Sequence, residues 1–284
     1  QAAGTVGDMA HEHLADLLDL DAEVLSEYHR EVAEWVSAHL TERARVVTER
    51  ARVVDVGAGT GTGAVTLARQ LPDAEVIALD VDEQMLKHVQ DKARASGLAD
   101  RIRTVQADLD QPCPDDLKPA DLVWAANSLH HMSNPARAVA HIYQMLRPGG
   151  LLAVTELESF PRFLTDPAGA ALEERIHTAM ARRRDEAGMH MHEDWPARFA
   201  EAGLAVESER RFEIALQPPP GSPMAASVAR YAMVTLCRAR HGLEDKLSAG
   251  DIAELDALAP ALSARDDLTV RTSRTVWLAR KPTG

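Results

Sequence analysis

Two spacings of apolar residues alternate along residues 52–157. Short runs of consecutive apolar, often β-branched residues, as in RVVDV, EVIALD and DLVWAA, predict buried strands. Between these runs, apolar residues recur every three or four positions, which predicts helices over 64–71, 82–96 and 134–146. The order through Leu157 is β-α-β-α-β-α-β-α-β, with a mostly irregular link over 111–119. This alternation predicts an α/β fold with a parallel sheet and helices on both faces.

The rest of the chain has a more helical pattern. A helix is expected from Asp21, its N-cap, to Leu40, others over 166–187 and from the cap Asp194, and strands at 212–216 and in RTVWLARK. A helical insert at about 218–262 separates these last two strands and suggests a lid or a subunit contact. The predicted division is an N-terminal helical cap, 1–45, and a main domain, 46–284, that contains the insert.

Glycine recurs at every second position directly after the first strand. Gly57, Gly59, Gly61 and Gly63 cannot all be needed for one turn, so some are expected to let a ligand lie against the backbone. Such a turn leaves free N–H groups at a helix N-terminus beside parallel strand ends. The stretch therefore predicts a nucleotide site.

Acidic and polar side chains follow the other strands of the predicted sheet. Asp80 ends the second strand about 20 residues past the glycines, where a carboxylate can bind ribose hydroxyls, although a solvated loop carboxylate is the alternative. Asp108 ends the third strand and suits the exocyclic amine of adenine. The fourth strand leads into a polar cluster, and the fifth brings Glu156 to its carboxyl end; the cluster comprises Asn127, Ser128, His130 and His131.

Other candidates lie outside these strand ends. Tyr28, with His29 beside it, is on the apolar stripe of the first helix and is either a core aromatic or a residue that closes over the ligand. The segment HMHEDW is expected to cover the pocket, with Trp195 as either a substrate contact or a core residue. His190 and His192 have no third ligand at metal spacing, so no metal site is expected.

Composition limits the partners. The 284 residues carry 31 basic and 44 acidic side chains, a net charge of −13 that disfavours a nucleic-acid partner. Cys113 and Cys237 are far apart and predict neither a metal site nor a disulfide framework. No apolar run approaches the ~20 residues of a membrane span and the N-terminus is not signal-like, so a soluble cytoplasmic protein is expected.

Taken together, residues 53–157 resemble the class I S-adenosylmethionine-dependent methyltransferases. The segments DVGAGTGTG, ALDVDEQML, QADL, NSLHHM and LRPGG before a strand occur in the family's order. The resemblance implies a Rossmann-like, seven-stranded, mostly parallel sheet, S-adenosylmethionine as methyl donor and S-adenosylhomocysteine as product.

The resemblance also implies roles for individual residues. Asp55, Gly57, Ala58 and Gly59 would surround the methionine part of the donor, and Ala126 or Asn127 would lie by its methionyl end. Asp80 would hold the ribose, Asp108 with Leu109 the adenine, and Val81 and Met85 would flank the adenosine. On the acceptor side, His130 or His131 is the candidate base with Tyr28 as a further catalytic candidate, and His29, Glu156, His192 and Trp195 are candidates for contacting the substrate. For each histidine, a structural hydrogen bond is an equal alternative.

A dinucleotide enzyme is a rival interpretation, because Gly59, Gly61 and Ala64 also fit G-x-G-x-x-A. Asp108, LHHM and LRPGG have no role in that alternative. The favoured hypothesis is an in-line methyl transfer to a small molecule, for which an aromatic or heterocyclic metabolite with an O, N or carbon nucleophile is the candidate. A non-catalytic donor-binding protein and a peptide or protein methyltransferase are the alternatives, and a homodimer through the insert or the N-terminal helices is a further expectation.

Overall fold

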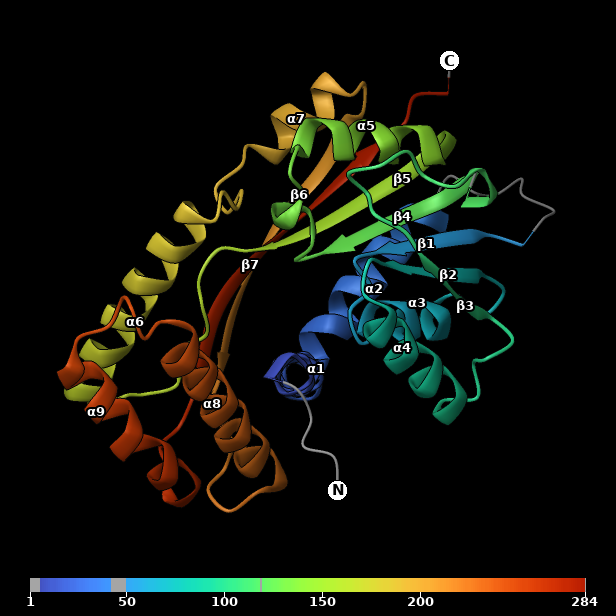
Figure 1. Ribbon diagram of the computed structural model, residues 1–284. Helices are drawn as coiled ribbons and strands as arrows, with labels where there is room; N and C mark the ends of the chain where they lie inside the picture. Colours follow the sequence, from blue (N-terminus) through green and yellow to red (C-terminus); the bar gives the residue numbers. More distant parts are fainter. Residues whose placement is uncertain (1–5, 42–49, 118, 284) are drawn as a thin grey trace. The chain divides into compact units, whose positions relative to one another are not determined.

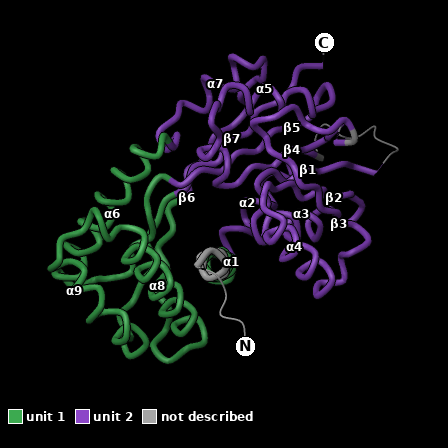
Figure 2. Tube along the Cα trace, in the orientation of Figure 1, with its two compact units in different colours: residues 1–26, 158–188, 213–273 green, residues 27–157, 189–212, 274–284 purple. Residues whose placement is uncertain are grey.

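The structure, a computed structural model, describes residues 6–41, 50–117 and 119–283 (Figure 1). It separates into two compact units, which are coloured in Figure 2. The sheet unit comprises residues 27–157, 189–212 and 274–284, and the helical unit comprises residues 1–26, 158–188 and 213–273.

A seven-stranded sheet with the order β3-β2-β1-β4-β5-β7-β6 organises the fold. The strands are β1 (Arg52–Val56), β2 (Glu75–Asp80), β3 (Ile102–Gln106), β4 (Ala120–Ala126), β5 (Leu146–Leu157), β6 (Ala205–Leu216) and β7 (Val270–Arg280). Strands β1 to β5 pair in parallel, whereas β7 runs antiparallel to β5. The mostly parallel sheet expected from the sequence is confirmed.

Helices cover both faces of the sheet within the sheet unit. Figure 1 shows α5 (Pro135–Met145) and α7 (Trp195–Glu201) on one face, with α2 (Ser26–Thr41), α3 (Thr62–Gln70) and α4 (Glu83–Ala95) on the other. Three predicted N-caps are confirmed, since the side chains of Asp82, Asn134 and Asp194 accept backbone N–H bonds of α4, α5 and α7. A short 3₁₀ turn, η1 (Asp115–Leu117), lies in the link that was expected to be mostly irregular.

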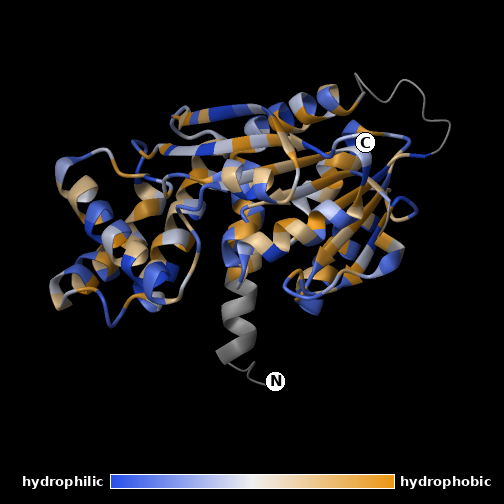
Figure 3. Ribbon diagram, turned by 90° about the horizontal axis from the view of Figure 1, so that it is seen from above, coloured by the Kyte–Doolittle hydropathy of each residue, from blue (hydrophilic) through white to orange (hydrophobic). Residues whose placement is uncertain are grey.

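A hydrophobic core lies between the sheet and the helices α5 and α7. Its strand residues are nearly all apolar, and apolar colouring follows the strands in Figure 3. Fully buried members of this core include Val54, Ile77, Val123, Ile142, Val154 and Phe199. Because side chains on successive strand residues point to opposite faces, Glu156 points to the same face as Val154.

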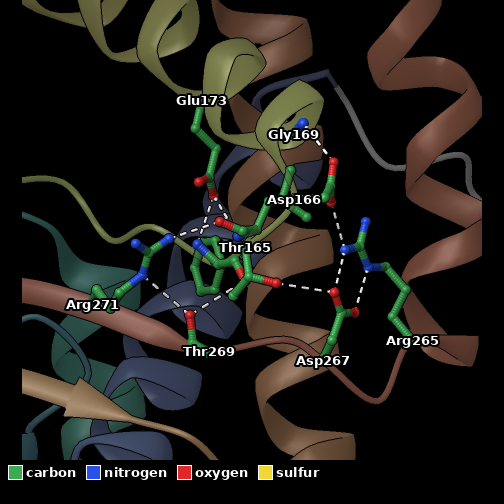
Figure 4. Close-up of polar contacts among 10 residues, drawn as sticks. Thr165, Asp166, Gly169, Glu173, Arg265, Asp267, Thr269 and Arg271 are labelled. Atoms are coloured by element: carbon green, nitrogen blue, oxygen red, sulfur yellow. Dashed lines mark hydrogen bonds and ion pairs between the residues drawn. The ribbon is translucent and has the colours of Figure 1, made fainter.

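The helical unit contains α1 (Val6–Val24), α6 (Pro167–Glu186), α8 (Pro223–Gly242), α9 (Ala249–Leu258) and the 3₁₀ helix η3 (Ala259–Ala264). Figure 4 shows how the segment before α6 is fixed. Asp166 accepts the N–H of Gly169 and a bond from Arg265, which also bonds Asp267. The buried Glu173 accepts the N–H groups of Phe163 and Leu164, and burial raises the pKa of its carboxyl.

Several boundaries differ from the sequence prediction. Asp21 does not begin a helix; it lies in the last turn of α1 and accepts a 2.7 Å bond from the hydroxyl of Tyr231, and the helix break falls at Leu25. Strand β3 ends two residues before Asp108, and β5 begins at Leu146, earlier than expected. The compact units also place α2 with the sheet, whereas the predicted boundary between residues 45 and 46 lies outside the described residues.

No helix among the described residues has both the length and the apolar composition that crossing a bilayer requires.

Candidate functional site

The candidate site lies at the carboxyl ends of the parallel strands. The chain passes from β1 to β2 and β3 on one side, and from β4 to β5 on the other, so β1 and β4 are adjacent at the point where the direction of winding reverses. Open α/β sheets bind ligands in the crevice at such a point. The segments after β1, β2, β3 and β4, and the end of β5, therefore determine what can bind there.

The glycine loop after β1 is bonded to the protein rather than left open. The N–H groups of Gly57 and Ala58 both donate to the carbonyl of Leu79, at 2.8 and 3.0 Å, and Gly61 donates to the carbonyl of Ala58. The N–H of Gly59 donates to Asp80 Oδ2 at 2.9 Å. Neighbouring protein acceptors therefore use the N–H groups of these four loop residues, whereas the expectation of free N–H groups at the N-terminus of the following helix stays a prediction.

The alternate glycines are also explained by the protein itself. Gly57, Gly59 and Gly61 have positive φ angles of 66°, 51° and 89°. A Cβ at Gly57 would lie 2.4 Å from Ser128 Cβ, and one at Gly63 would lie 2.7 Å from Asp55 Oδ2. The close approach that requires glycine at these two positions is to protein atoms, so the ligand contact inferred from the glycine spacing is not needed to explain them.

Asp55 lies beneath the start of α3 and is 2% exposed. Its carboxyl accepts the N–H of Ala64, and its Oδ2 has no hydrogen-bond partner among the described residues. Burial raises the pKa of this carboxyl from 3.8 to about 7, the Ala64 bond lowers it, and the charge of Asp80 raises it. When ionised, an acid at the N-terminus of this helix opposes a bound pyrophosphate and favours a cation such as a sulfonium or an ammonium.

Asp80 is held in place at the end of β2. Its Oδ2 accepts the Gly59 N–H, and its Oδ1 accepts the Asp82 N–H at 3.0 Å. Each carboxylate oxygen keeps a further lone pair, so a ribose hydroxyl could still be bound. Val81 next to it is an exposed apolar residue with 59% of its surface accessible, as expected for a side chain that flanks an adenosine.

Met85, expected beside Val81, is placed differently. It is 4% exposed and belongs to the buried face of α4. The spacing of apolar residues in this helix predicts Met85 as a core residue, and its burial agrees with that prediction rather than with a contact to the ligand.

The segment after β3 is connected to the segment after β4. Asp108 is exposed and accepts the N–H of Asp110, whereas Leu109 is 2% exposed as a whole residue and its carbonyl accepts a 2.9 Å bond from His141 Nδ1, which places Leu109 in the core. The Asp110 carboxylate accepts the N–H groups of Ser133 and Asn134, at 2.9 and 3.3 Å. These bonds hold the residue that would bind adenine against the start of α5.

The end of β4 contains the one non-glycine residue with positive φ in the described part of the chain. Asn127 has φ 51° and follows the half-buried Ala126, and its N–H donates to the carbonyl of Thr155 at 2.8 Å. Its Oδ1 is buried, with no hydrogen-bond partner among the described residues. A strained residue with an unsatisfied polar atom is typical of a ligand site. Ser128 follows it and donates to the carbonyl of Val56 at 2.9 Å.

His130 and Glu156 form a buried pair. His130 lies in the 3₁₀ turn η2 (Leu129–His131), and its Nδ1 is 2.5 Å from Glu156 Oε2. The two side chains are 5% and 6% exposed. With a proton on Nδ1 donated to the carboxylate, Nε2 is left as an acceptor, which is the arrangement of an oriented general base.

Two features extend this pair. The His131 residue is exposed, and its ring centroid lies 4.2 Å from that of His130. The second oxygen of Glu156, Oε1, is buried and has no hydrogen-bond partner among the described residues. The pair is therefore accompanied by an exposed imidazole and a buried acceptor that a ligand donor could satisfy.

Tyr28 also lies near the carboxyl ends of the strands. Its ring packs against Phe212 and His29, at centroid distances of 5.3 and 5.1 Å, and lies 5.0 Å from the guanidinium carbon of Arg274. Arg274 pairs with Leu157, the neighbour of Glu156. The sequence pattern missed Arg274 because its position depends on the β5–β7 register.

The segment after α6 is only partly as expected. His192 is exposed, whereas Trp195 is 2% exposed and stacks with Phe199 in the core. The interpretation of Trp195 as a substrate contact is corrected to its alternative, a core tryptophan, because Trp195 belongs to the buried cluster beneath the sheet and α5. Within the described residues no group of three or more His, Cys, Asp or Glu side chains is arranged to hold a metal ion.

The sequence of the chain is similar to those of known methyltransferases. Residues 53–150 match a family described as "Methyltransferase domain". The 27-O-demethylrifamycin SV methyltransferase of Amycolatopsis mediterranei (strain S699) is 31% identical over 179 residues, which are 62% of this chain and 62% of that protein. Methyltransferase GfsG of Streptomyces halstedii is 33% identical over 175 residues, 61% of this chain and 59% of that protein. The chain thus spans about three fifths of the length of these curated relatives.

A solved structure supports the fold alone. The [4+2]-cyclase SpnF superposes with a TM-score of 0.51 and 24% identity, over 88% of this chain and 81% of that one. A shared fold does not fix the reaction, so the function must be argued from the side chains at the site.

Proposed function

We propose that this chain, a class I S-adenosylmethionine-dependent methyltransferase by the domain at residues 53–150, transfers a methyl group to a hydroxyl oxygen of a small molecule. The observation that carries the proposal is the buried His130–Glu156 pair beside the strand ends. An aliphatic or phenolic hydroxyl must lose its proton as the new bond to carbon forms, and an oriented imidazole can accept that proton.

The residues around the glycine loop suit a cationic donor. The acids Asp55 and Asp80 lie at the ends of β1 and β2, and their carboxyls accept the N–H groups of Ala64 and Gly59. Asp80 would hold the ribose, Asp108 the adenine, and Asn127 the methionyl end. When bound, S-adenosylmethionine supplies an activated methyl group on a sulfonium leaving group.

The protein's own contribution is to orient the acceptor and accept its proton. Glu156 Oε2 fixes the His130 ring through Nδ1, and Nε2 takes the proton of the acceptor hydroxyl as the oxygen attacks the methyl carbon. Holding the reactants in line can supply roughly 7 to 11 kcal/mol. The name of the Amycolatopsis relative, which refers to an O-demethylated compound, supports an oxygen nucleophile.

Variants of the three residues test the assignment of the base. The assay is release of S-adenosylhomocysteine from S-adenosylmethionine in the presence of a panel of hydroxylated aromatic and macrocyclic compounds. His130→Ala and Glu156→Gln should lower turnover by about 10²- to 10⁴-fold, the usual contribution of general-base assistance. Both should leave binding of S-adenosylhomocysteine unchanged. His131→Ala is the matched variant, because it removes the neighbouring imidazole but no bond to Glu156.

The outcomes separate the alternatives. Full turnover in His130→Ala with loss in His131→Ala would move the base to His131. Product release only with peptides would favour a peptide methyltransferase, and donor binding without product release from any compound would favour a non-catalytic donor-binding protein. A cytoplasmic location and a homodimer through the insert or the N-terminal helices stay predictions, which fractionation and sedimentation would test.

A further inference from the structure

The histidine-containing segment between α6 and α7 has no part in the proposed function so far. It begins after Gly188, whose φ is 68°, and from Met189 onward it belongs to the sheet unit. It contains His190, which is half-buried, and His192, which is exposed. No group of ligands for a metal ion includes them among the described residues.

One main-chain hydrogen bond joins this segment to the turn that carries the buried histidine. In η2, the carbonyls of Ser128 and Leu129 accept the N–H groups of His131 and Met132, at 3.2 and 3.1 Å. The next carbonyl, that of His130, accepts the N–H of His190 at 3.0 Å. The amide of residue 190 therefore continues the hydrogen bonding of the turn from a position sixty residues further along the chain.

Side chains on the same segment hold that amide in place. His190 Nδ1 lies 3.4 Å from Glu193 Oε2, and Glu193 Oε1 accepts a 2.7 Å bond from Arg198 Nε on α7. Glu193 is only 14% exposed, and its carbonyl accepts the N–H of Trp195. The segment is thus attached to a helix that cannot shift without disturbing the core.

That core is shared with the turn. Trp195 and Phe199 of α7 belong to the same buried cluster as Leu129, the first residue of η2. The segment and the turn are therefore fixed to one another in two ways, through the core and through the bond between the His190 amide and the His130 carbonyl. This arrangement constrains the main chain of His130, while Glu156 constrains its ring.

We propose that His190 is a positioning residue of the proposed methyl transfer, and that its backbone amide, not its imidazole, performs this role. The proposal rests on the assignment of His130 as the base. The amide fixes the main chain of His130 so that its ring can bond Glu156 and direct Nε2 toward the acceptor. A misplacement of about 1 Å of a reacting group can cost about 100-fold in rate, so the loss of one main-chain bond here has a measurable effect.

Four variants of the full chain separate the amide from the side chain. His190→Pro removes the N–H, and His190→Ala keeps it while removing the imidazole. His192→Pro and His192→Ala place the same changes two residues further along the same segment.

The first readout needs no acceptor. The proton between a buried imidazole and a carboxylate in a short charge-assisted bond gives a downfield NMR resonance, which is assigned here by its loss in Glu156→Gln. The others are the affinity for S-adenosylhomocysteine and turnover as a function of pH.

The expected result is specific to one variant. His190→Pro should lose or broaden the downfield resonance, lower turnover by about 10- to 100-fold and change its pH profile, with the affinity for S-adenosylhomocysteine unchanged. His190→Ala, His192→Pro and His192→Ala should keep the resonance and the pH profile. Retention of both in His190→Pro would overturn the proposal, and equal losses in His190→Ala would assign the effect to the imidazole instead.

A second measurement covers a His190→Pro protein that does not fold. In the wild-type chain, hydrogen exchange at the amide of residue 190 should be slow, and Glu193→Gln should speed it by weakening the anchor on Arg198. Fast exchange in the wild type would overturn the proposal. The resonance and the exchange rate report on positioning even if no acceptor is ever methylated, so a failure of the proposed function is distinguishable from a failure of this inference.

Discussion

Asp55 illustrates at the scale of one residue how burial changes chemistry. Its carboxyl is 2% exposed, and burial raises its pKa from 3.8 to about 7. A carboxyl whose pKa is raised on folding stabilises the fold fully below its unfolded pKa, and this contribution is lost as the pH rises through the folded pKa. The contribution of Asp55 to the free energy of unfolding should therefore decrease as the pH rises from 4 to 8.

Asp55→Asn tests this directly. An asparagine can still accept the Ala64 N–H but does not ionise, so its stability relative to the wild type should increase from pH 5 to pH 8. Urea unfolding of both proteins at the two pH values measures the difference, and Asp100→Asn, an exposed carboxylate, is the control. A difference that does not change with pH would contradict the assigned burial effect.

The same scale shows which site residues a sequence can reveal. Asp80, Asp108, Asn127, His130 and Glu156 were identified because each follows or ends a predicted strand. The pairing of His130 with Glu156 and its bond to the His190 amide were not predicted, because these contacts join residues far apart in sequence, whereas spacing reports only on neighbours. Met85 and Trp195 are buried, as the core interpretation of each predicts; the resemblance suggested a ligand contact for Met85, and the pattern left the role of Trp195 open.

At the scale of the element, the glycine loop and the turn after β4 form one packed unit. Gly57 has φ 66°, and a Cβ there would lie 2.4 Å from Ser128 Cβ. Gly57→Ala should cost about 1 to 2 kcal/mol for the left-handed conformation, plus the cost of displacing Ser128, and it should also weaken binding of S-adenosylhomocysteine. Gly97→Ala is the matched control, because Gly97 has φ 68° and nothing within 4 Å of its Cβ position.

Denaturation and calorimetry of the two variants compare these costs. Gly97→Ala should lose only the conformational part and bind S-adenosylhomocysteine normally. Equal destabilisation of both variants would mean that the contact with Ser128 yields easily and that the two segments are not packed as one unit.

Element boundaries show the limit of local patterns. Asp82, Asn134 and Asp194 were predicted as caps because a capping side chain bonds N–H groups two or three residues away. Asp21 has the same local appearance, but its carboxylate is bonded by Tyr231 of α8 and the helix continues through it. The glycine loop was likewise recognised, but the acceptors that use its N–H groups, Leu79 and Asp80, belong to the next strand.

At the scale of the whole molecule, the order of strands could be anticipated but the division of the chain could not. The alternation of strands and helices through Leu157 leads to the parallel part of the sheet. The helical unit, by contrast, collects three separate stretches of sequence, residues 1–26, 158–188 and 213–273, and β6 and β7 contribute residues to both units. Because each unit is assembled from stretches that are separate in sequence, a single boundary along the chain does not describe the division.

The choice of cofactor is a property of the whole folded chain, because a ligand that binds only the native state raises its stability. At 100 times its dissociation constant, such a ligand adds about 2.7 kcal/mol, which corresponds to a rise in Tm of roughly 5 °C for a protein of this size. S-adenosylhomocysteine should produce this rise, and Asp80→Ala should reduce it because the loss of one hydrogen-bonding carboxylate costs about 1 to 3 kcal/mol of binding. NAD at the same concentration should leave the Tm unchanged, because the carboxyls of Asp55 and Asp80 accept the N–H groups of Ala64 and Gly59 and make this end of the sheet acidic. A larger rise with NAD than with S-adenosylhomocysteine, measured by differential scanning calorimetry, would contradict the acidic, non-phosphate character assigned to the site.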